Sequence, residues 1–107
     1  MPGFVAVAEE IKKKGVDTIA CISVNDAFVM DAWGKDQKTD DKVMMLGDGN
    51  GEFTRAMDLT TDASRFGLGT RSQRYAMIVE DGVIKDLFVE KPGAFEVSSA
   101  ENVLKHL

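Results

Sequence analysis

The sequence predicts an α/β domain in which a mixed sheet carries helices on its faces. Two observations lead to this class. Short apolar segments alternate with amphipathic segments in the first part of the chain, and a strong hairpin signal stands near its end. Alternating strands and helices build parallel sheets, whereas a hairpin adds an antiparallel pair. We expect one domain over residues 1–107, because no linker, repeat or low-complexity stretch interrupts the chain.

The chain opens with a predicted helix that ends near Gly15. Pro2 suits the first turn of a helix, since its missing N–H needs no partner there. Residues 12–14 are all lysine and lie favourably at the negative end of the helix dipole. Gly15 is a suitable residue to follow the last turn. The apolar residues at helical spacing are Phe4, Val7, Ala8 and Ile11.

Two strands are predicted at residues 18–24 and 43–46. Both segments are short and almost entirely small or apolar, which is typical of strands buried on both faces of a parallel sheet. Between them, Asn25 or Asp26 can cap a second helix. Its shared apolar face is predicted to hold Phe28, Val29, Ala32 and Trp33.

The second half of the chain predicts a short helix around Phe53, then a loop, a hairpin and a last helix. Residues 60–72 are polar and contain glycine, so we expect a loop there. Asp81-Gly82 separates two apolar strands and is the strongest short-range hairpin signal. Ser98 to Glu101 reads as a capping box before a final helix. That helix carries Val103, Leu104 and Leu107 on one face.

An α/β sheet normally places a strand before its first helix, whereas this chain opens in the helix itself. From this order we expect a domain that is N-terminally incomplete and lacks its N-terminal strands.

The charge and cysteine content narrow the possible functions. Thirteen basic against eighteen acidic residues give a net charge of -5, which argues against binding to nucleic acid or to anionic membranes. No apolar run approaches the ~20 residues that span a bilayer. Residues 1–4 lack the features of a signal peptide. With Cys21 as its single cysteine, the chain has no internal disulfide, and we expect a reduced protein in the cytoplasm.

No metal or cofactor site is predicted. Residues 48–52 resemble the start of a calcium loop, but its sixth position is Phe53 rather than glycine and its twelfth is Leu59 rather than glutamate. This segment therefore predicts a tight turn.

Several stretches in collinear order resemble the peroxiredoxin-5 and plant type II subfamily of the peroxiredoxins. They extend over the whole chain, from Pro2 to Leu107. The matching stretches are Pro2-Gly3-Phe4, Gly15-Val16-Asp17, residues 20–30, Ala32-Trp33-Gly34-Lys35, residues 67–72, Arg74-Tyr75-Ala76 and residues 95–101.

The resemblance implies a thioredoxin-like fold and a thiol peroxidase activity toward hydrogen peroxide and alkyl hydroperoxides. In this family a peroxidatic cysteine attacks the peroxide and becomes a sulfenic acid, which glutaredoxin with glutathione, or thioredoxin, reduces. The cysteine lies in a Pro-x-x-x-Thr-x-x-Cys loop, and an arginine from a later strand lowers the thiol pKa and holds the peroxide oxygens. The resemblance also implies a homodimer for an intact domain, with residues 66–70 as part of the contact.

Arg74 matches the family arginine, and it is the predicted catalytic residue. The loop, its threonine and its peroxidatic cysteine would lie upstream of Met1 and are absent from this sequence. The alternative for Arg74 is an arginine on an edge strand that reaches solvent. Arg71 is expected at the surface or at an interface.

Cys21 is not at the peroxidatic position, and two interpretations remain open for it. In the first it is a small buried hydrophobe with a raised pKa. In the second it is a secondary thiol, since some type II members carry a cysteine there. The family's resolving cysteine, where present near the C-terminal helix, falls in the region of Val97.

Three hypotheses for function follow. The chain represents a thiol peroxidase of which it is a truncated form, and then an in-frame upstream segment should carry the cysteine loop. Alternatively it is a short non-catalytic form that partners full-length peroxiredoxin subunits. The third hypothesis is a fragment without a function of its own. We rank the first highest and expect the 107 residues alone to be inactive.

Overall fold

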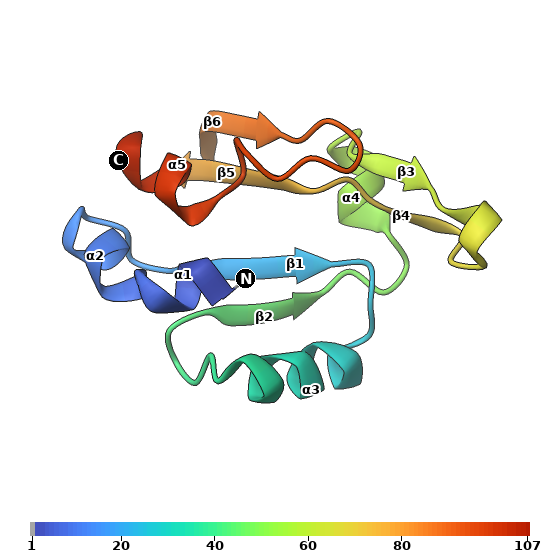
Figure 1. The fold of residues 1–107 in the computed structure, drawn as a ribbon, viewed down its shortest axis with the longest axis horizontal. Helices are drawn as coiled ribbons and strands as arrows, with labels where there is room; N and C mark the ends of the chain where they lie inside the picture. The colour runs from blue at the N-terminus through green and yellow to red at the C-terminus, as the bar shows by residue number, and fades with distance from the viewer. Residues whose placement is uncertain (1) are drawn as a thin grey trace.

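The computed structural model describes residues 2–107 and shows an α/β arrangement with three two-stranded sheets (Figure 1). In chain order the elements are α1 (Pro2–Ala6), α2 (Ala8–Lys13), β1 (Ala20–Ser23), α3 (Ala27–Gln37), β2 (Met44–Gly47), α4 (Glu52–Ala56), β3 (Thr60–Asp62), a 3-10 turn (Ser64–Phe66), β4 (Thr70–Ser72), β5 (Tyr75–Glu80), β6 (Val83–Val89) and α5 (Ala100–Lys105). The predicted order is confirmed, with β3 and β4 added to it.

The strand directions are those expected, but the strands do not join into a single sheet. β1 runs parallel to β2, from the pair Ala20 and Met44 to the pair Ser23 and Gly47. β5 and β6 are antiparallel, as are the two short strands β3 and β4. In Figure 1, β1, β2 and α3 lie together on one side, and the β5–β6 hairpin with α5 lies on the other.

The hairpin turn is confirmed in its backbone detail. Asp81 has φ 51° and Gly82 has φ 76°. Two consecutive residues with positive φ are what a two-residue hairpin turn with the correct twist requires, and Asp-Gly supplies them at low cost. The pairing shifts between Ile78 and Val79, which gives β5 and β6 an irregular register at that point.

Helix α3 begins as predicted but buries a different face. Asp26 is its N-cap, and its Oδ1 accepts a 2.8 Å hydrogen bond from the backbone N–H of Val29. Met30 and Gly34 are buried in this helix, whereas Phe28 is 87% exposed. Helix α3 packs on β2, so the side toward β2 is the buried side. The predicted apolar face is therefore wrong.

The two parallel strands are also less buried than predicted. Ala20 is exposed, and Met44 and Leu46 of β2 are exposed as well. Within residues 2–107, β1 and β2 pair only with each other. A strand with one free edge and a partly open face keeps contact with solvent, which explains the difference.

Three further expectations need correction. The first helix is two helices, because Val7 leaves helical geometry with φ -110° and ψ 15°. Residues 60–72 are not a plain loop: they form the β3–β4 pair around the 3-10 turn. Helix α5 is capped by Ser99, whose Oγ accepts from the N–H of Asn102 at 3.2 Å. The predicted cap, Ser98, bonds elsewhere.

The core is small for the length of the chain. The accessible surface is 7376 Å², whereas a folded monomer of this length exposes about 5,900 Å². Large apolar side chains are among the exposed residues, including Phe28, Phe66 and Leu68. The buried apolar residues of the described part of the chain are Ala8, Ile11, Met30, Val43, Leu59, Ala100 and Val103.

No helix within the described residues is long and apolar enough to cross a membrane.

Candidate functional site

Arg74 lies between β4 and β5, directly before the first residue of β5. Its backbone carbonyl accepts a 2.9 Å hydrogen bond from the N–H of Glu90, so the two residues face each other at the open end of the hairpin. The guanidinium carbon lies 5.0 Å from the centroid of the Phe95 ring, within the range of a cation–π contact. Within residues 2–107 the Arg74 side chain makes no hydrogen bond or ion pair.

Glu90 is a buried acid, 7% exposed, and both oxygens of its carboxylate accept hydrogen bonds from the loop that follows. Oε2 accepts from the backbone N–H of Glu96 at 2.6 Å and of Ser98 at 2.9 Å, and from the Ser98 hydroxyl at 2.7 Å. Oε1 accepts from the N–H of Val97 at 3.2 Å. We call this arrangement of Glu90 with residues 96–98 the Glu90 clasp.

The Glu90 clasp sets the charge state of the acid. Burial raises the pKa of Glu90, but the Ser98 hydroxyl and the backbone N–H groups of residues 96–98 stabilise the carboxylate more strongly. The net result is a pKa lowered from 4.5 to about 2. Glu90 is therefore ionised under all ordinary conditions.

Cys21 is half-buried in β1, opposite Met45 of β2. Burial raises the pKa of its thiol above the ordinary 9.0. Burial also raises the pKa of Tyr75, and the negative charges of Asp48 and Cys21 add to that effect. Tyr75 is the first residue of β5.

The structure does not join the two residues predicted to carry redox chemistry. In the described part of the chain, no hydrogen bond or ion pair connects Cys21 with Arg74. A thiol with a raised pKa is mostly protonated at neutral pH and is a poor nucleophile. This environment agrees with the interpretation of Cys21 as a small buried residue, and the role of Arg74 stays a prediction.

Arg71 has an internal role that the sequence analysis missed. It is half-buried in β4 and donates from Nη1 to the carbonyl of Val24 at 2.6 Å and to Oδ1 of Asn25 at 3.1 Å. Its Nε donates to the carbonyl of Leu68 at 3.0 Å. Arg71 is thus half-buried and bonded to turns of this chain rather than fully at the surface. Its expected place at an interface stays a prediction.

Residues 48–52, which resemble the start of a calcium loop, are held by internal hydrogen bonds. Asp48 accepts from the N–H and the hydroxyl of Thr54, at 2.9 and 2.6 Å, and from the N–H of Phe53 at 3.2 Å. The Thr54 hydroxyl is the main reason that the pKa of Asp48 is lowered. Among the described residues, no group of three His, Cys, Asp or Glu side chains is placed to hold a metal ion.

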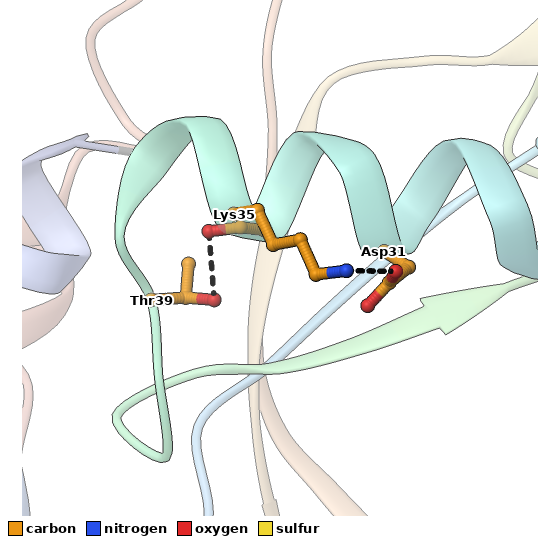
Figure 2. Close-up of polar contacts among 4 residues, drawn as sticks. Asp31, Lys35 and Thr39 are labelled. Carbon is orange, nitrogen blue, oxygen red and sulfur yellow. Dashed lines mark hydrogen bonds and ion pairs between the residues drawn. The ribbon is translucent and has the colours of Figure 1, made fainter.

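A shallow hollow between α3 and β2 offers no built binding site. Figure 2 shows the polar contacts on its rim: Lys35 pairs with Asp31 at 3.0 Å, and the Thr39 hydroxyl donates to the carbonyl of Gly34 at 3.2 Å. The Asp31 and Lys35 side chains are largely exposed, so their pair is weak. The drawn polar groups already have partners within the protein, and we assign them no ligand.

Comparison with known proteins decides the family. The Redoxin family profile matches residues 1–104. This chain belongs to the Redoxin family. The peroxiredoxin resemblance predicted from the sequence is confirmed. The predicted thioredoxin-like fold is confirmed as well, because the structural neighbours have that fold.

The relatives of this redoxin chain are peroxiredoxins by name. The chain is 56% identical to peroxiredoxin-2E of Arabidopsis thaliana and 53% identical to peroxiredoxin-2E-2 of Oryza sativa, both named chloroplastic. All of the chain aligns in both cases, and it spans 47% and 49% of those proteins, about half of their length.

A solved structure extends the comparison to geometry. Reduced Prx3 of Vibrio vulnificus in complex with H2O2 superimposes with a TM-score of 0.94 at 53% identity. The match covers 99% of this chain and 68% of that protein. The arrangement of the elements described above is therefore that of a peroxiredoxin.

Sequence reasoning missed the residues that surround Arg74. Glu90 directly follows β6 and precedes Pro92-Gly93, so the signal in the sequence was an acid just after a strand and before a turn. Nothing in the local pattern shows that its carboxylate accepts from Ser98. The stack of Phe95 on Arg74 joins a residue just before β5 to one after β6, and it follows from the tertiary structure alone.

Proposed function

We propose that this chain belongs to a protein that reduces hydrogen peroxide and alkyl hydroperoxides with a thiol, and that Arg74 stabilises the thiolate and the peroxide. The observation that supports the proposal is the state of Arg74. Its guanidinium is stacked on Phe95, and its donors are free within residues 2–107. A guanidinium with free N–H groups can donate to peroxide oxygens and favours a nearby thiolate. The relative whose structure contains H2O2 has the same fold.

In this proposal the thiol that attacks peroxide is not Cys21. Its side chain lies in a strand and burial raises its pKa, whereas attack on peroxide needs a thiolate. We therefore propose that the 107 residues alone do not turn over peroxide. The reducing partner is glutaredoxin with glutathione, or thioredoxin, and no bound cofactor takes part.

Peroxide consumption with dithiothreitol as reductant tests the proposal. The 107-residue chain should show no turnover. A version extended through any in-frame upstream codons should be active, and Arg74→Ala should lower its kcat/KM by roughly 10²-fold, as for other groups that stabilise a developing negative charge. Arg65→Ala, another exposed arginine, is the matched control and should leave kcat/KM unchanged.

Two outcomes would contradict the proposal. Turnover by the 107 residues that Cys21→Ser abolishes would make Cys21 the nucleophile. An active extended protein that is unaffected by Arg74→Ala would remove Arg74 from the reaction.

A second candidate function is that of a non-catalytic partner of full-length peroxiredoxin subunits. The exposed apolar side chains support it, because patches of this kind mark interaction surfaces. Phe66 is 74% exposed and Leu68 is 51% exposed, and both lie in the segment proposed for a homodimer contact. Sedimentation of the chain alone and mixed with a full-length subunit distinguishes self-association from mixed dimers.

The proposed location is the cytoplasm, where a protein with a lone, reduced cysteine is expected. The two plant relatives are named chloroplastic, so an organelle is the alternative. Fractionation of cells that express the natural gene distinguishes the two.

A further inference from the structure

The acid that faces Arg74 does not pair with it. Glu90 lies opposite Arg74 in the hairpin, since its N–H donates to the Arg74 carbonyl. Opposite charges at facing positions of an antiparallel pair usually attract each other across the strands. Here the Glu90 side chain instead turns to residues 96–98, and both of its oxygens accept hydrogen bonds there.

Because the Glu90 carboxylate bonds to residues 96–98, Arg74 has no counter-ion in the described part of the chain. An Arg–carboxylate pair uses two parallel N–H groups and would occupy the edge of the guanidinium. The four donors of the Glu90 clasp satisfy the carboxylate completely, so it gains little by turning back to Arg74. Ser98 is the strongest of these contacts, because it gives two donors to one oxygen and is itself buried.

The same clasp fixes the residue that covers the face of Arg74. Phe95 directly precedes Glu96, whose N–H donates to Glu90 at 2.6 Å. The ring is 56% exposed, so core packing does not hold it in place. Its position over Arg74 is set by the backbone of the clasped loop and by the cation–π contact at 5.0 Å.

We propose that Glu90 and Phe95 are positioning residues for Arg74. The Glu90 clasp keeps the facing carboxylate from pairing with Arg74 and holds the Phe95 ring against the guanidinium. The N–H donor edge of the guanidinium therefore stays free. This inference rests on the proposed function, in which that edge receives the peroxide oxygens. An aromatic ring on the face restrains the guanidinium without using any N–H donor, which is the arrangement that a donor group needs before its ligand arrives.

A second arginine–phenylalanine pair offers an internal control. Arg65 stacks on its own neighbour Phe66 at 5.8 Å, within the 3-10 turn. No clasp involves this pair. Changes at Phe95 or Glu90 should therefore act on Arg74 and leave Arg65 unaltered.

The test follows the Arg74 Nε–H resonance by NMR in the ¹⁵N-labelled 107-residue chain, with inorganic sulfate as the probe of a free donor edge. Sulfate should shift the Arg74 resonance. Phe95→Leu should remove the ring-current shift and weaken sulfate binding at Arg74 by about two- to fivefold, the size of an exposed cation–π contact. Phe95→Tyr keeps the ring and should restore both.

The clasp is tested by Glu90→Gln, with Glu101→Gln as the matched control on the exposed first turn of α5. Glu90→Gln should move the amide resonances of residues 96–98 and the Arg74 side-chain resonance together. If Glu90→Gln does not fold, Ser98→Ala weakens the same clasp and serves in its place.

Three outcomes would overturn the inference. Sulfate does not shift the Arg74 resonance, or Phe95→Leu changes neither that resonance nor sulfate binding. In the third, Glu90→Gln moves the amide resonances of residues 96–98 but leaves the Arg74 side-chain resonance where it was. None of these readouts depends on peroxide turnover, so failure of the proposed function would be seen separately, in the kinetic assay.

Discussion

Arg71 joins two turns that are far apart in the sequence by donating from Nη1 to the carbonyl of Val24 at 2.6 Å, across 47 residues. Its Nε donates to Leu68. β1 ends at Ser23 and the α3 cap is Asp26, so the turn between them is held by a side chain from β4. The carbonyls of a tight turn lack ladder partners, and an arginine with several donors can satisfy more than one of them.

Arg71→Ala should therefore destabilise the chain by about 1–2 kcal/mol, the size of a half-buried hydrogen-bonded charge. It should also increase hydrogen exchange in both turns, whereas Arg65→Ala should do neither. Urea unfolding and amide exchange of residues 24–26 and 66–69 provide the measurements. Equal effects of the two substitutions would show that Arg71 does not connect the turns.

Met30 and Phe28 lie two residues apart in α3 and should differ sharply in their effect on stability. Met30 is 1% exposed and Phe28 is 87% exposed. Met30→Ala should cost about 2–5 kcal/mol, since it removes buried methylene groups and leaves a cavity. Phe28→Ala should change stability by less than about 0.5 kcal/mol. Urea unfolding followed by circular dichroism compares them, and a larger loss for Phe28→Ala would reverse the observed orientation of the helix.

Gly47 and Gly49 form a second matched pair. A Cβ on Gly47 would meet the carbonyl oxygen of Asn25 at 2.7 Å, whereas one on Gly49 would meet the same atom at 3.9 Å. The first contact forces a shift of the backbone, and the second is an ordinary van der Waals contact. We expect Gly47→Ala to cost about 1–3 kcal/mol and Gly49→Ala to be nearly neutral, as measured by thermal unfolding. Two neutral substitutions would mean that the β1–α3 turn moves freely.

Glu90 should make the free energy of unfolding depend on pH in the acid range. Its folded pKa of about 2 lies below its ordinary 4.5. Its contribution is therefore fully present above the ordinary value and is lost as the pH falls towards about 2. Glu90→Gln should flatten the stability profile in that range, while Glu101→Gln should leave it unchanged. The residual slope belongs to Asp48 and Asp62, whose pKa values are also lowered. Urea unfolding across this range is the measurement, and identical slopes with and without Glu90 would contradict the clasp.

Cys21 should react slowly with thiol reagents in the folded chain. Burial raises its pKa above 9.0, so the thiolate fraction at neutral pH is below that of an ordinary cysteine. Labelling with iodoacetamide should be slower than in urea, and its rate should rise with pH to a midpoint above that of a free cysteine. Folded and unfolded chains that react equally fast would show that the thiol is accessible and unperturbed.

The local features of the fold were predictable from the sequence. Asp26 caps α3 and Asp81-Gly82 turns the hairpin, because each needs only its own backbone geometry and its nearest neighbours. The parallel and antiparallel directions followed in the same way from segment lengths and turn signals. The order of matching stretches identified the family before any geometry was known.

The burial of individual faces was not predictable. The α3 pattern allowed Phe28 and Trp33 to face inward, and only the packing on β2 selected Met30 and Gly34. Periodicity fixes which residues share a face of a helix, and the neighbouring elements decide which face is covered.

The sequence by itself determined the family, the order of the main helices and strands, and the position of Arg74 in the chain. Only the tertiary structure decided what surrounds Arg74. The Glu90 clasp and the Phe95 stack depend on which donors reach a carboxylate after the chain has folded back on itself. A buried charge takes the partners that satisfy it most completely, and no local sequence pattern specifies which partners those are.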